Sequence, residues 1–240
     1  MKYPFFLALT ALFIPLTLPG QGTLPFQVGE TLHYDSNLNF VRAGTAKLQV
    51  LALESVDDVP AYHILFTMST NSILDHIFKI RDRVETWIDA EDLYTLRFNK
   101  QVREGRHRYR FSANMNYEDS VVTTGDESFK FDHELRDPYS LLYYLRTLPL
   151  KVGDEFSFVT FDNNQFMDIH LTVHRKERID VRAGEFDCFV VEPFREGRPL
   201  LKNKADMTIW LSDDHLRLPV KVVSKAVFGS IILKLRKLED

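Results

Sequence analysis

Two histidines in the second half of the chain have a spacing that can hold a metal ion. On a helix, His170 and His174 would lie on one face, close enough to share a zinc ion. The surrounding segment Asp168–His174 alternates polar and apolar residues, which predicts a strand instead. Four residues of strand separate the two rings by roughly 13 Å. The six other histidines stand singly, so we expect no metal site.

The chain offers no recognisable nucleophile. Its one cysteine, Cys188, lies in the alternating segment Phe186–Val191 with apolar neighbours on both sides, so we interpret it as a core residue. A catalytic thiol needs a nearby histidine or helix end to lower its pKa, and this segment has neither. No serine lies in a G-x-S-x-G motif, and the isolated glycines form no phosphate loop. We therefore expect no catalytic residue and no cofactor.

Carboxylates are the remaining candidates for acid–base chemistry. Asp213 and Asp214 stand between an apolar strand and Arg217-Leu218-Pro219, which indicates a turn. A glycosidase-like pair would need two carboxyl groups that face each other across a cleft, and adjacent residues at a strand end point apart. Asp82 and Asp89 lie in another polar strand, so a groove assembled from distant carboxylates stays open.

The strand that contains Asp82 is polar on both faces. Asp82 shares one face with Val84, Thr86 and Ile88, whereas Arg81, Arg83, Glu85 and Trp87 share the other. This pattern fits the wall of a barrel or cleft that contacts water or a ligand, which makes Asp82 and Trp87 candidate ligand-binding residues. An edge strand with two solvated faces would have the same pattern.

Basic residues crowd a predicted hairpin that turns at Glu104-Gly105. They are Arg97, Lys100, Arg103, Arg106, Arg108 and Arg110. Arg106, Arg108 and Arg110 recur at period two and should line one face, opposite His107, Tyr109 and Phe111. The next segment, 118–137, is mainly acidic, so cross-strand charge pairing on a solvated face is one explanation. The other is a cationic face that binds an anion, such as a lipid head group or an acidic envelope polymer.

Short strands and turns recur along most of the chain. Alternation is clear in Thr45–Leu53, Glu155–Phe158, Met207–Leu211 and Leu218–Val223, and a last strand is expected over Ser230–Leu238. Turn residues recur every 8 to 15 residues, for example at Ala43-Gly44, Asn163-Asn164 and Ala183-Gly184. The pattern predicts an all-β, mainly antiparallel fold, in which a meander curls into a sandwich, half-barrel or barrel.

Two segments break the strand pattern. Asp137-Pro138 followed by Tyr139–Arg146 predicts a helix with an aspartate N-cap and proline at its first position. Leu141, Leu142, Leu145 and Leu148 fall on one face, as a helix docked on a sheet requires. A second short helix is expected over Ser72–Phe78, where Ile73, Leu74 and Ile77 share a face.

The amino terminus has the layout of a secretory signal peptide. Lys2 is followed by an uncharged apolar run from Phe5 to Leu18 and by small residues up to Gly22. A membrane anchor needs about 20 apolar residues, and this run is shorter and contains Pro15. We expect residues 1–22 to be cleaved and 23–240 to form a single antiparallel β domain, exported to the periplasm or outer cell envelope. There is no cysteine near the cleavage site, so we do not expect a lipid-anchored lipoprotein.

Composition excludes several partners. The chain has 30 Lys and Arg against 34 Asp and Glu, and the predicted signal removes only one charge, so a basic nucleic-acid binder is not expected. No apolar stretch after the signal approaches membrane-spanning length. The lone cysteine excludes an internal disulfide, so the hydrophobic core must supply the stability.

The chain resembles a family of exported bacterial proteins known only as domain of unknown function 3108. The resembling segments are Phe26–Tyr34, Trp87-Ile88-Asp89, Asp137–Arg146, Ala183–Phe186 and Trp210–Asp214, and their order and spacing span nearly the whole mature chain. The resemblance implies an exported, mainly antiparallel β domain and no particular chemistry.

Three functions remain open at this point. The first is a non-catalytic envelope protein that binds a lipid or another amphiphilic or anionic component, with the apolar inside of the curled sheet and the basic hairpin as its contacts. The second is a hydrolase of envelope polymers whose carboxylates, among them Asp82, Asp89 and Asp213, converge in a groove. The third is a scaffold with protein partners only.

Overall fold

The computed structural model of the protein describes residues 24–194, 207–226 and 229–240. The predicted signal peptide at residues 1–22 lies outside these residues. The described chain is built almost entirely of strands, with two helices, α1 (Ser72–Asp75) and α2 (Pro138–Thr147). The predicted mainly antiparallel β fold is therefore confirmed.

In the part of the chain that the structure describes, fourteen strands form one sheet in which every neighbouring pair is antiparallel. The strands are β1 (Thr31–Leu38), β2 (Val41–Val56), β3 (Val59–Thr70), β4 (Arg81–Asp89), β5 (Thr95–Glu104), β6 (His107–Asn116), β7 (Val121–Thr124), β8 (Glu127–Lys130), β9 (Glu155–Asp162), β10 (Gln165–Val181), β11 (Gly184–Phe194), β12 (Met207–Ser212), β13 (Pro219–Ala226) and β14 (Gly229–Glu239). Each strand pairs with the strand that follows it in sequence, except that β8 does not pair with β9. β1 pairs in addition with β14, so β8 and β9 are the two edge strands of the sheet.

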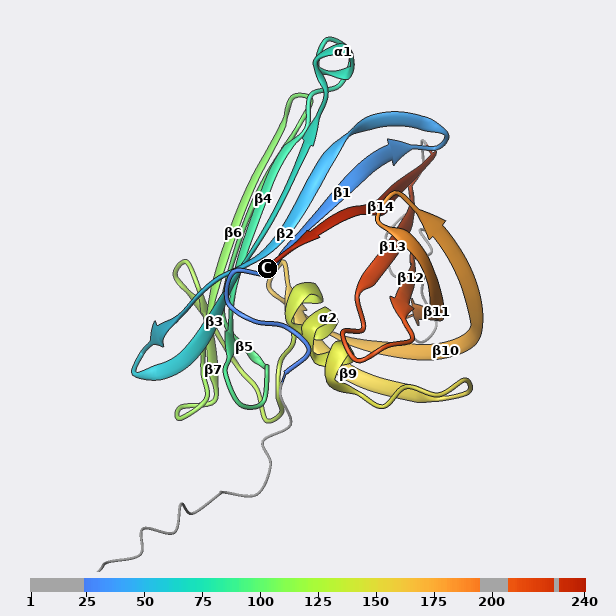
Figure 1. Cartoon of the computed structure of the whole chain (residues 1–240). Helices are drawn as coiled ribbons and strands as arrows, with labels where there is room; N and C mark the ends of the chain where they lie inside the picture. The colour runs from blue at the N-terminus through green and yellow to red at the C-terminus, as the bar shows by residue number, and fades with distance from the viewer. Residues whose placement is uncertain (1–23, 195–206, 227–228) are drawn as a thin grey trace, which may run out of the picture.

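The twist of so long a sheet curls it around a central space that α2 occupies. Figure 1 shows β2–β6 on one side, β10–β13 curving round the other, and α2 between them. Long strands make this curl possible, and the longest, β10, has 17 residues. The predicted strands at Thr45–Leu53, Asp168–His174 and Met207–Leu211 lie inside β2, β10 and β12.

The sheet curls without closing, and one short segment spans the gap between its two sides. The backbone N–H of Thr95 in β5 donates to the carbonyl of Leu135 at 2.9 Å, and Leu135 also forms an isolated parallel bridge with Val159 in β9. Beside it the ring of Phe161 packs near those of Phe111 and Phe129, with centroids 6.2 and 5.4 Å away. The two sides of the sheet are thus joined here by backbone hydrogen bonds of this segment and by aromatic packing, and not by hydrogen bonds between two adjacent strands.

The predicted helix with an aspartate N-cap is α2. One carboxylate oxygen of Asp137 accepts the backbone N–H groups of Tyr139 and Ser140, and the other accepts the hydroxyls of Thr86 and Thr95 at 2.6 and 2.8 Å. The cap therefore also pins the start of α2 to β4 and β5. Three apolar clusters, each with residues of α2, fill the inside of the curled sheet, and a fourth, smaller cluster packs against Trp87 on the other face.

A fully buried ion pair fixes the last turn of α2. The Arg146 guanidinium makes two hydrogen bonds of 2.7 Å to the Glu30 carboxylate and donates to the carbonyls of Pro25 and Leu216. The side chains of Arg146 and Glu30 are 0% and 3% exposed, so neither charge is solvated. The pair joins the chain before β1, α2 and the loop before β13.

The second predicted helix is shorter than expected. The sequence pattern suggests Ser72–Phe78, whereas α1 ends at Asp75. The Asn71 side chain caps α1 by accepting the backbone N–H of Leu74 at 3.0 Å. The Asp75 carboxylate is bound by Arg81 and by the Thr70 hydroxyl, which ties the helix end back to β3 and β4. Ile73 and Ile77 are left pointing into solvent.

Candidate functional site

The eight residues that the sequence suggests for ligand binding lie in three separate places. Asp82 and Lys100 face the inside of the sheet, like Val84 and Phe98 in the same strands. Trp87 and Arg97 are cross-strand neighbours on the outer face. The other four lie around one hairpin, and we call them the arginine face: Arg103, Arg106, Arg108 and Arg110.

The hairpin that positions the arginine face turns where the sequence predicts. Glu104 and His107 are the closing pair, and Gly105 and Arg106 form the two-residue turn. Gly105 has φ +54°, as a two-residue hairpin turn that begins with glycine requires. Its backbone N–H donates to the Lys79 carbonyl at 2.8 Å, which joins the turn to the loop after α1.

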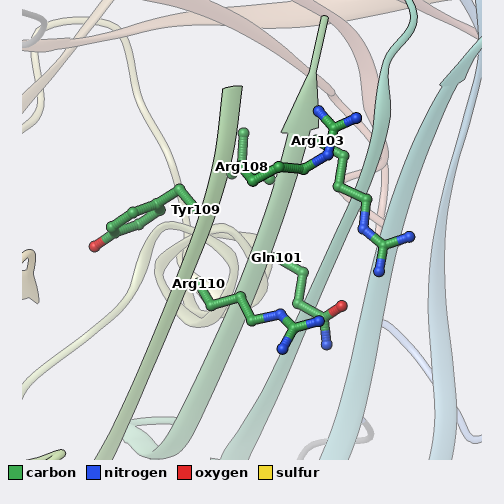
Figure 2. Close-up of a pocket in the computed structure, with 6 residues that line it drawn as sticks. Gln101, Arg103, Arg108, Tyr109 and Arg110 are labelled. Atoms are coloured by element: carbon green, nitrogen blue, oxygen red, sulfur yellow. The ribbon is translucent and has the colours of Figure 1, made fainter. Parts of the chain in front are cut away.

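Register places like charges opposite each other on the outer face of this hairpin. Arg103 pairs directly with Arg108, and Arg110 pairs with Gln101. Figure 2 shows the ring of Tyr109 pointing away from these side chains, as the predicted period-two alternation requires. These residues line a surface hollow of about 340 Å³. Like charges directly opposite each other on a sheet are destabilising.

Neighbouring arginines are neutralised, but the arginine face is not. Arg81 binds Asp75, and Arg83 binds Glu85 at 2.6 Å. Within the described residues, no carboxylate lies within 4.0 Å of the guanidinium groups of the arginine face. The Arg108 guanidinium donates only to the backbone carbonyls of Gly105 and His107, at 2.8 and 2.7 Å.

The predicted cross-strand pairing with the acidic segment is therefore wrong. That segment begins after β6, and β7 pairs with β6 only at Asn114–Asn116. Arg108 and Arg110 lie in the part of β6 next to the β5–β6 turn. This part pairs with β5 on one side and with no described strand on the other. The acidic residues therefore do not come opposite the arginines.

Trp87 and Arg97 belong to a different, self-contained cluster. The Trp87 ring stacks on His63 with 4.3 Å between centroids, and its indole N–H donates to Glu54. Arg97 lies over the same ring at 5.6 Å and donates to Asn114. Six residues of β5 separate Arg97 from Arg103, roughly 20 Å of strand. The two predicted residues thus have partners within the chain and lie away from the arginine face.

On the inner face of the hairpin, two carboxyl groups come together. Asp82 accepts the backbone N–H of Arg103 at 2.9 Å, and its carboxyl meets that of Glu104. Burial raises the pKa of Asp82, with the Arg103 amide and Lys100 opposing the shift. Burial and the adjacent Asp82 charge raise the pKa of Glu104. Sequence reasoning missed Glu104, although period two places it on the same face of β5 as Lys100.

Lys100 serves the fold rather than the arginine face. Its ammonium binds Asp162 at 2.9 Å and lies 5.8 Å from the centroid of the Tyr109 ring. Asp162 ends β9, so this pair links β5 to the opposite end of the sheet. Beside it the Tyr109 hydroxyl donates to Asn163, which adds a second link of the same kind.

The carboxylates proposed for a hydrolase do not converge. Asp82 lies at the inner face of the hairpin, whereas Asp89 accepts the backbone N–H groups of Glu91 and Asp92 at the end of β4. Asp213 binds Lys176 and Arg217 beyond β12. Asp214 accepts the backbone N–H groups of Leu216 and Arg217, as the predicted turn requires. The groove built on distant carboxylates therefore has no support from these residues.

The residues that suggest metal or thiol chemistry have structural surroundings. His170 and His174 both lie on β10, where His170 contacts the Ser157 hydroxyl and His174 contacts Glu192. Among the described residues, no three His, Cys, Asp or Glu side chains cluster as a metal site. Cys188 is fully buried in an apolar cluster, and burial raises the pKa of its thiol to about 12. The interpretation of Cys188 as a core residue agrees with its position.

The inside of the sheet also bears on the lipid hypothesis. Tyr143, Phe98, Phe161 and Arg146 are among the side chains that are less than 2% exposed there. The larger hollows lie at the surface instead, and one of about 740 Å³ borders the hairpin and the β9–β10 turn. Ligand contacts are therefore to be sought on the surface of the hairpin rather than inside the curl.

A model of the family described as protein of unknown function (DUF3108) matches residues 31–236. The chain belongs to this family. Comparison with curated proteins finds no match. The crystal structure of a β-barrel-like protein of domain of unknown function DUF1849 from Brucella abortus is similar with a TM-score of 0.61 and 14% identity, over 88% of this chain and 97% of that one. At that identity the likeness shows the fold alone.

A second solved structure is less similar. It is a protein from Parabacteroides distasonis described as a candidate lipoprotein, with a TM-score of 0.37 and 11% identity over 89% of this chain and 96% of that one. A score this low supports no argument about this protein. Within the described residues, neither helix has the length and apolar character needed to cross a membrane.

Proposed function

We propose that this DUF3108 protein is a non-catalytic component of the cell envelope that binds anionic groups through the arginine face. Phosphate and carboxylate are the shared chemistry, whether they belong to a lipid head group or to an acidic polymer. Export rests on the signal-like layout of residues 1–22, and we treat residues 23–240 as one domain.

One observation supports the proposal above all others. Arg103 and Arg108 are direct cross-strand partners without a carboxylate beside either guanidinium in the described chain. A fold that needed only solubility would gain from an acidic residue at either position. An anion that bridges the two guanidinium groups removes the repulsion and gains charge-assisted hydrogen bonds.

Arg108 and Arg110 lie on the part of β6 that β7 leaves unpaired, where charge can also prevent edge-to-edge association. This protective role is a second candidate function. It predicts that arginine removal causes aggregation without changing ligand affinity. The ligand-binding role predicts the reverse, so one set of variants separates the two.

The test uses inorganic polyphosphate and polyglutamate as soluble anionic probes. The triple variant Arg103→Gln, Arg108→Gln, Arg110→Gln should bind them on the order of 100-fold more weakly at low salt, since each cation near an anionic surface contributes about 1 kcal/mol. The matched control is Arg175→Gln, Arg178→Gln, Arg182→Gln, which removes the same charge from the far side of the sheet. Equal losses in the two variants, or unchanged binding in the first, would overturn the proposal.

A further inference from the structure

Three loops at one end of the sheet form a rim that combines exposed apolar side chains with unpaired cations. The rim consists of the β1–β2 turn, α1 with the loop that follows it, and the β5–β6 turn. Figure 1 shows α1 projecting beyond the rest of the sheet. Three hydrogen bonds hold these loops together.

Hydrogen bonds join the three loops. The N–H of Asn71 donates to the carbonyl of Ala43 at 2.8 Å, and its side-chain amide donates to the carbonyl of Arg42 at 3.1 Å, which joins α1 to β2. The Gly105 N–H donates to the Lys79 carbonyl, which joins the β5–β6 turn to the same loop. The rim is thus one connected surface rather than three independent tips.

Apolar side chains at the rim point into solvent. Phe40 is fully exposed at the β1–β2 turn, and Val41 next to it is 64% exposed. In the α1 loop, Ile73 and Ile77 are 76% and 79% exposed, and they lie four residues apart. Scattered single exposures need no explanation, but four large apolar side chains exposed on hydrogen-bonded loops are candidates for an interaction site.

The loop that carries Ile73 and Ile77 is held firmly. Asn71 caps α1, and Arg81 binds the Asp75 carboxylate through two nitrogen atoms, at 3.0 and 2.5 Å. Phe78 packs close to Gly105, where an added Cβ atom would come within 2.7 Å of its ring. The sequence therefore maintains an outward direction for these apolar residues instead of leaving them free to fold back.

Cations surround the apolar residues. Lys79 follows Phe78 directly, and Arg106, Arg103 and Arg108 lie at or next to the adjoining turn, all exposed. Asp35 and Asp75 at the rim are each paired with an arginine, at 2.8 and 2.5 Å. Glu104 beside the β5–β6 turn lies on the inner face of the hairpin against Asp82, away from the arginine face. Apolar residues flanked by cations complement the acyl chains and head groups of an anionic lipid layer.

We propose that the rim docks on the surface of an anionic lipid bilayer, with Phe40, Ile73 and Ile77 entering the acyl region and Lys79 and the arginine face contacting the head groups. This proposal rests on the proposed function, since it commits the anion to a lipid. The lipid proposal adds a contact between the apolar rim residues and the acyl chains. These residues would contribute nothing to the binding of a soluble polymer, so the two proposals can be tested separately.

The experiment measures binding of the purified protein to sedimented vesicles. One vesicle type contains phosphatidylglycerol and phosphatidylcholine in equal parts, and the other contains phosphatidylcholine alone. The rim variant is Phe40→Ser, Ile77→Ser, and its control is Leu53→Ser, Val152→Ser, which removes two exposed apolar residues outside the rim. Polyphosphate binding is measured for each protein as well.

We expect the rim variant to bind the anionic vesicles about tenfold more weakly, or worse, while polyphosphate binding and the control variant are unchanged. Equal binding to both vesicle types would overturn the lipid proposal. So would unchanged vesicle binding of the rim variant, or a wild-type protein that binds polyphosphate but no vesicles, and in both cases the proposed function would stand.

Two further outcomes separate the proposals. If the arginine variant loses neither polyphosphate nor vesicle binding while the rim variant loses vesicle binding, the proposed function fails and a purely apolar docking remains. If sedimentation shows that the wild-type protein self-associates and the rim variant does not, the rim covers a second copy of the chain, and the lipid proposal is wrong.

Discussion

Glu30 and Arg146 bind each other through two parallel hydrogen bonds of 2.7 Å inside the protein, although 116 residues separate them in sequence. The Arg146 guanidinium also lies 5.5 Å from the ring of Phe26 and 5.2 Å from that of Tyr143. Two carbonyl groups take further N–H donors of Arg146. The pair is satisfied on every side, which is the condition under which a buried ion pair is tolerated.

Removing one partner of this pair should destabilise the fold strongly. Arg146→Met leaves the Glu30 carboxylate buried without a counter-charge, so we expect the free energy of unfolding to fall by about 3–5 kcal/mol. Urea unfolding followed by circular dichroism measures the change. The control is Arg42→Gln, which breaks the more exposed pair with Asp35 and should cost less than about 1 kcal/mol. Similar losses in both variants would show that the buried pair has no special role.

The sequence predicted those features that depend on neighbouring residues. The strands follow from period-two alternation, the β5–β6 turn from Glu104-Gly105, and the start of α2 from Asp137-Pro138. Each is decided by local sterics and hydrogen bonding, which a short window of residues contains. The order and spacing of several segments also indicated a resemblance to the DUF3108 family, and the family match over residues 31–236 confirms that resemblance.

Features that depend on sheet register could not be predicted in the same way. The register of the β5–β6 hairpin places Arg103 opposite Arg108, and no acidic residue flanks Arg108 on its other side because β7 is short and pairs only with the far end of β6. Nothing near Arg146 in sequence indicates that Glu30 neutralises it. One signal was present, however. Side chains alternate between the two faces of a strand, so within β5 Arg97 and Arg103 share one face and Lys100 lies on the other.

If the arginine face is kept for binding, removing its repulsion should stabilise the protein. We expect Arg103→Gln to raise the free energy of unfolding by about 0.2–1 kcal/mol at low salt, the range of cross-strand pair effects. The gain should shrink as salt screens the charges. Urea unfolding at two salt concentrations measures it. A loss of stability would mean that Arg103 makes a favourable contact within the fold, which would weaken the functional argument.

Gly44 should tolerate no side chain, because β2 and β3 approach each other closely there. A Cβ atom at Gly44 would lie 1.9 Å from the Ser69 carbonyl oxygen, and backbone cannot move aside cheaply. We expect Gly44→Ala to destabilise the fold by about 3 kcal/mol in thermal or urea unfolding. Gly125→Ala is the comparison, since its Cβ meets nothing within 4 Å and only its φ of +56° costs about 1 kcal/mol. The reverse ranking would contradict the packing described for β2.

The carboxyl pair of Asp82 and Glu104 should make stability depend on pH in an unusual direction. Both pKa values are raised in the folded protein, chiefly by burial. The native state therefore holds these protons to higher pH than the unfolded chain does. Their stabilising contribution is complete below the ordinary carboxyl pKa near 4 and is lost as pH rises through the raised values. Glu104→Gln should reduce that loss, with burial still raising the pKa of Asp82, and make the protein more stable than wild type at neutral pH.

Glu85 in β4 provides a control for Glu104 in β5, because its pKa is shifted in the opposite direction. Arg83 holds the pKa of its carboxyl below the usual value, so its contribution is present at neutral pH and lost as pH falls through the lowered pKa. Glu85→Gln should therefore destabilise the protein at neutral pH and have little effect in acid. Urea midpoints at a series of pH values test both variants. A pH profile with the same sign in both variants would contradict the opposite pKa shifts of Glu104 and Glu85.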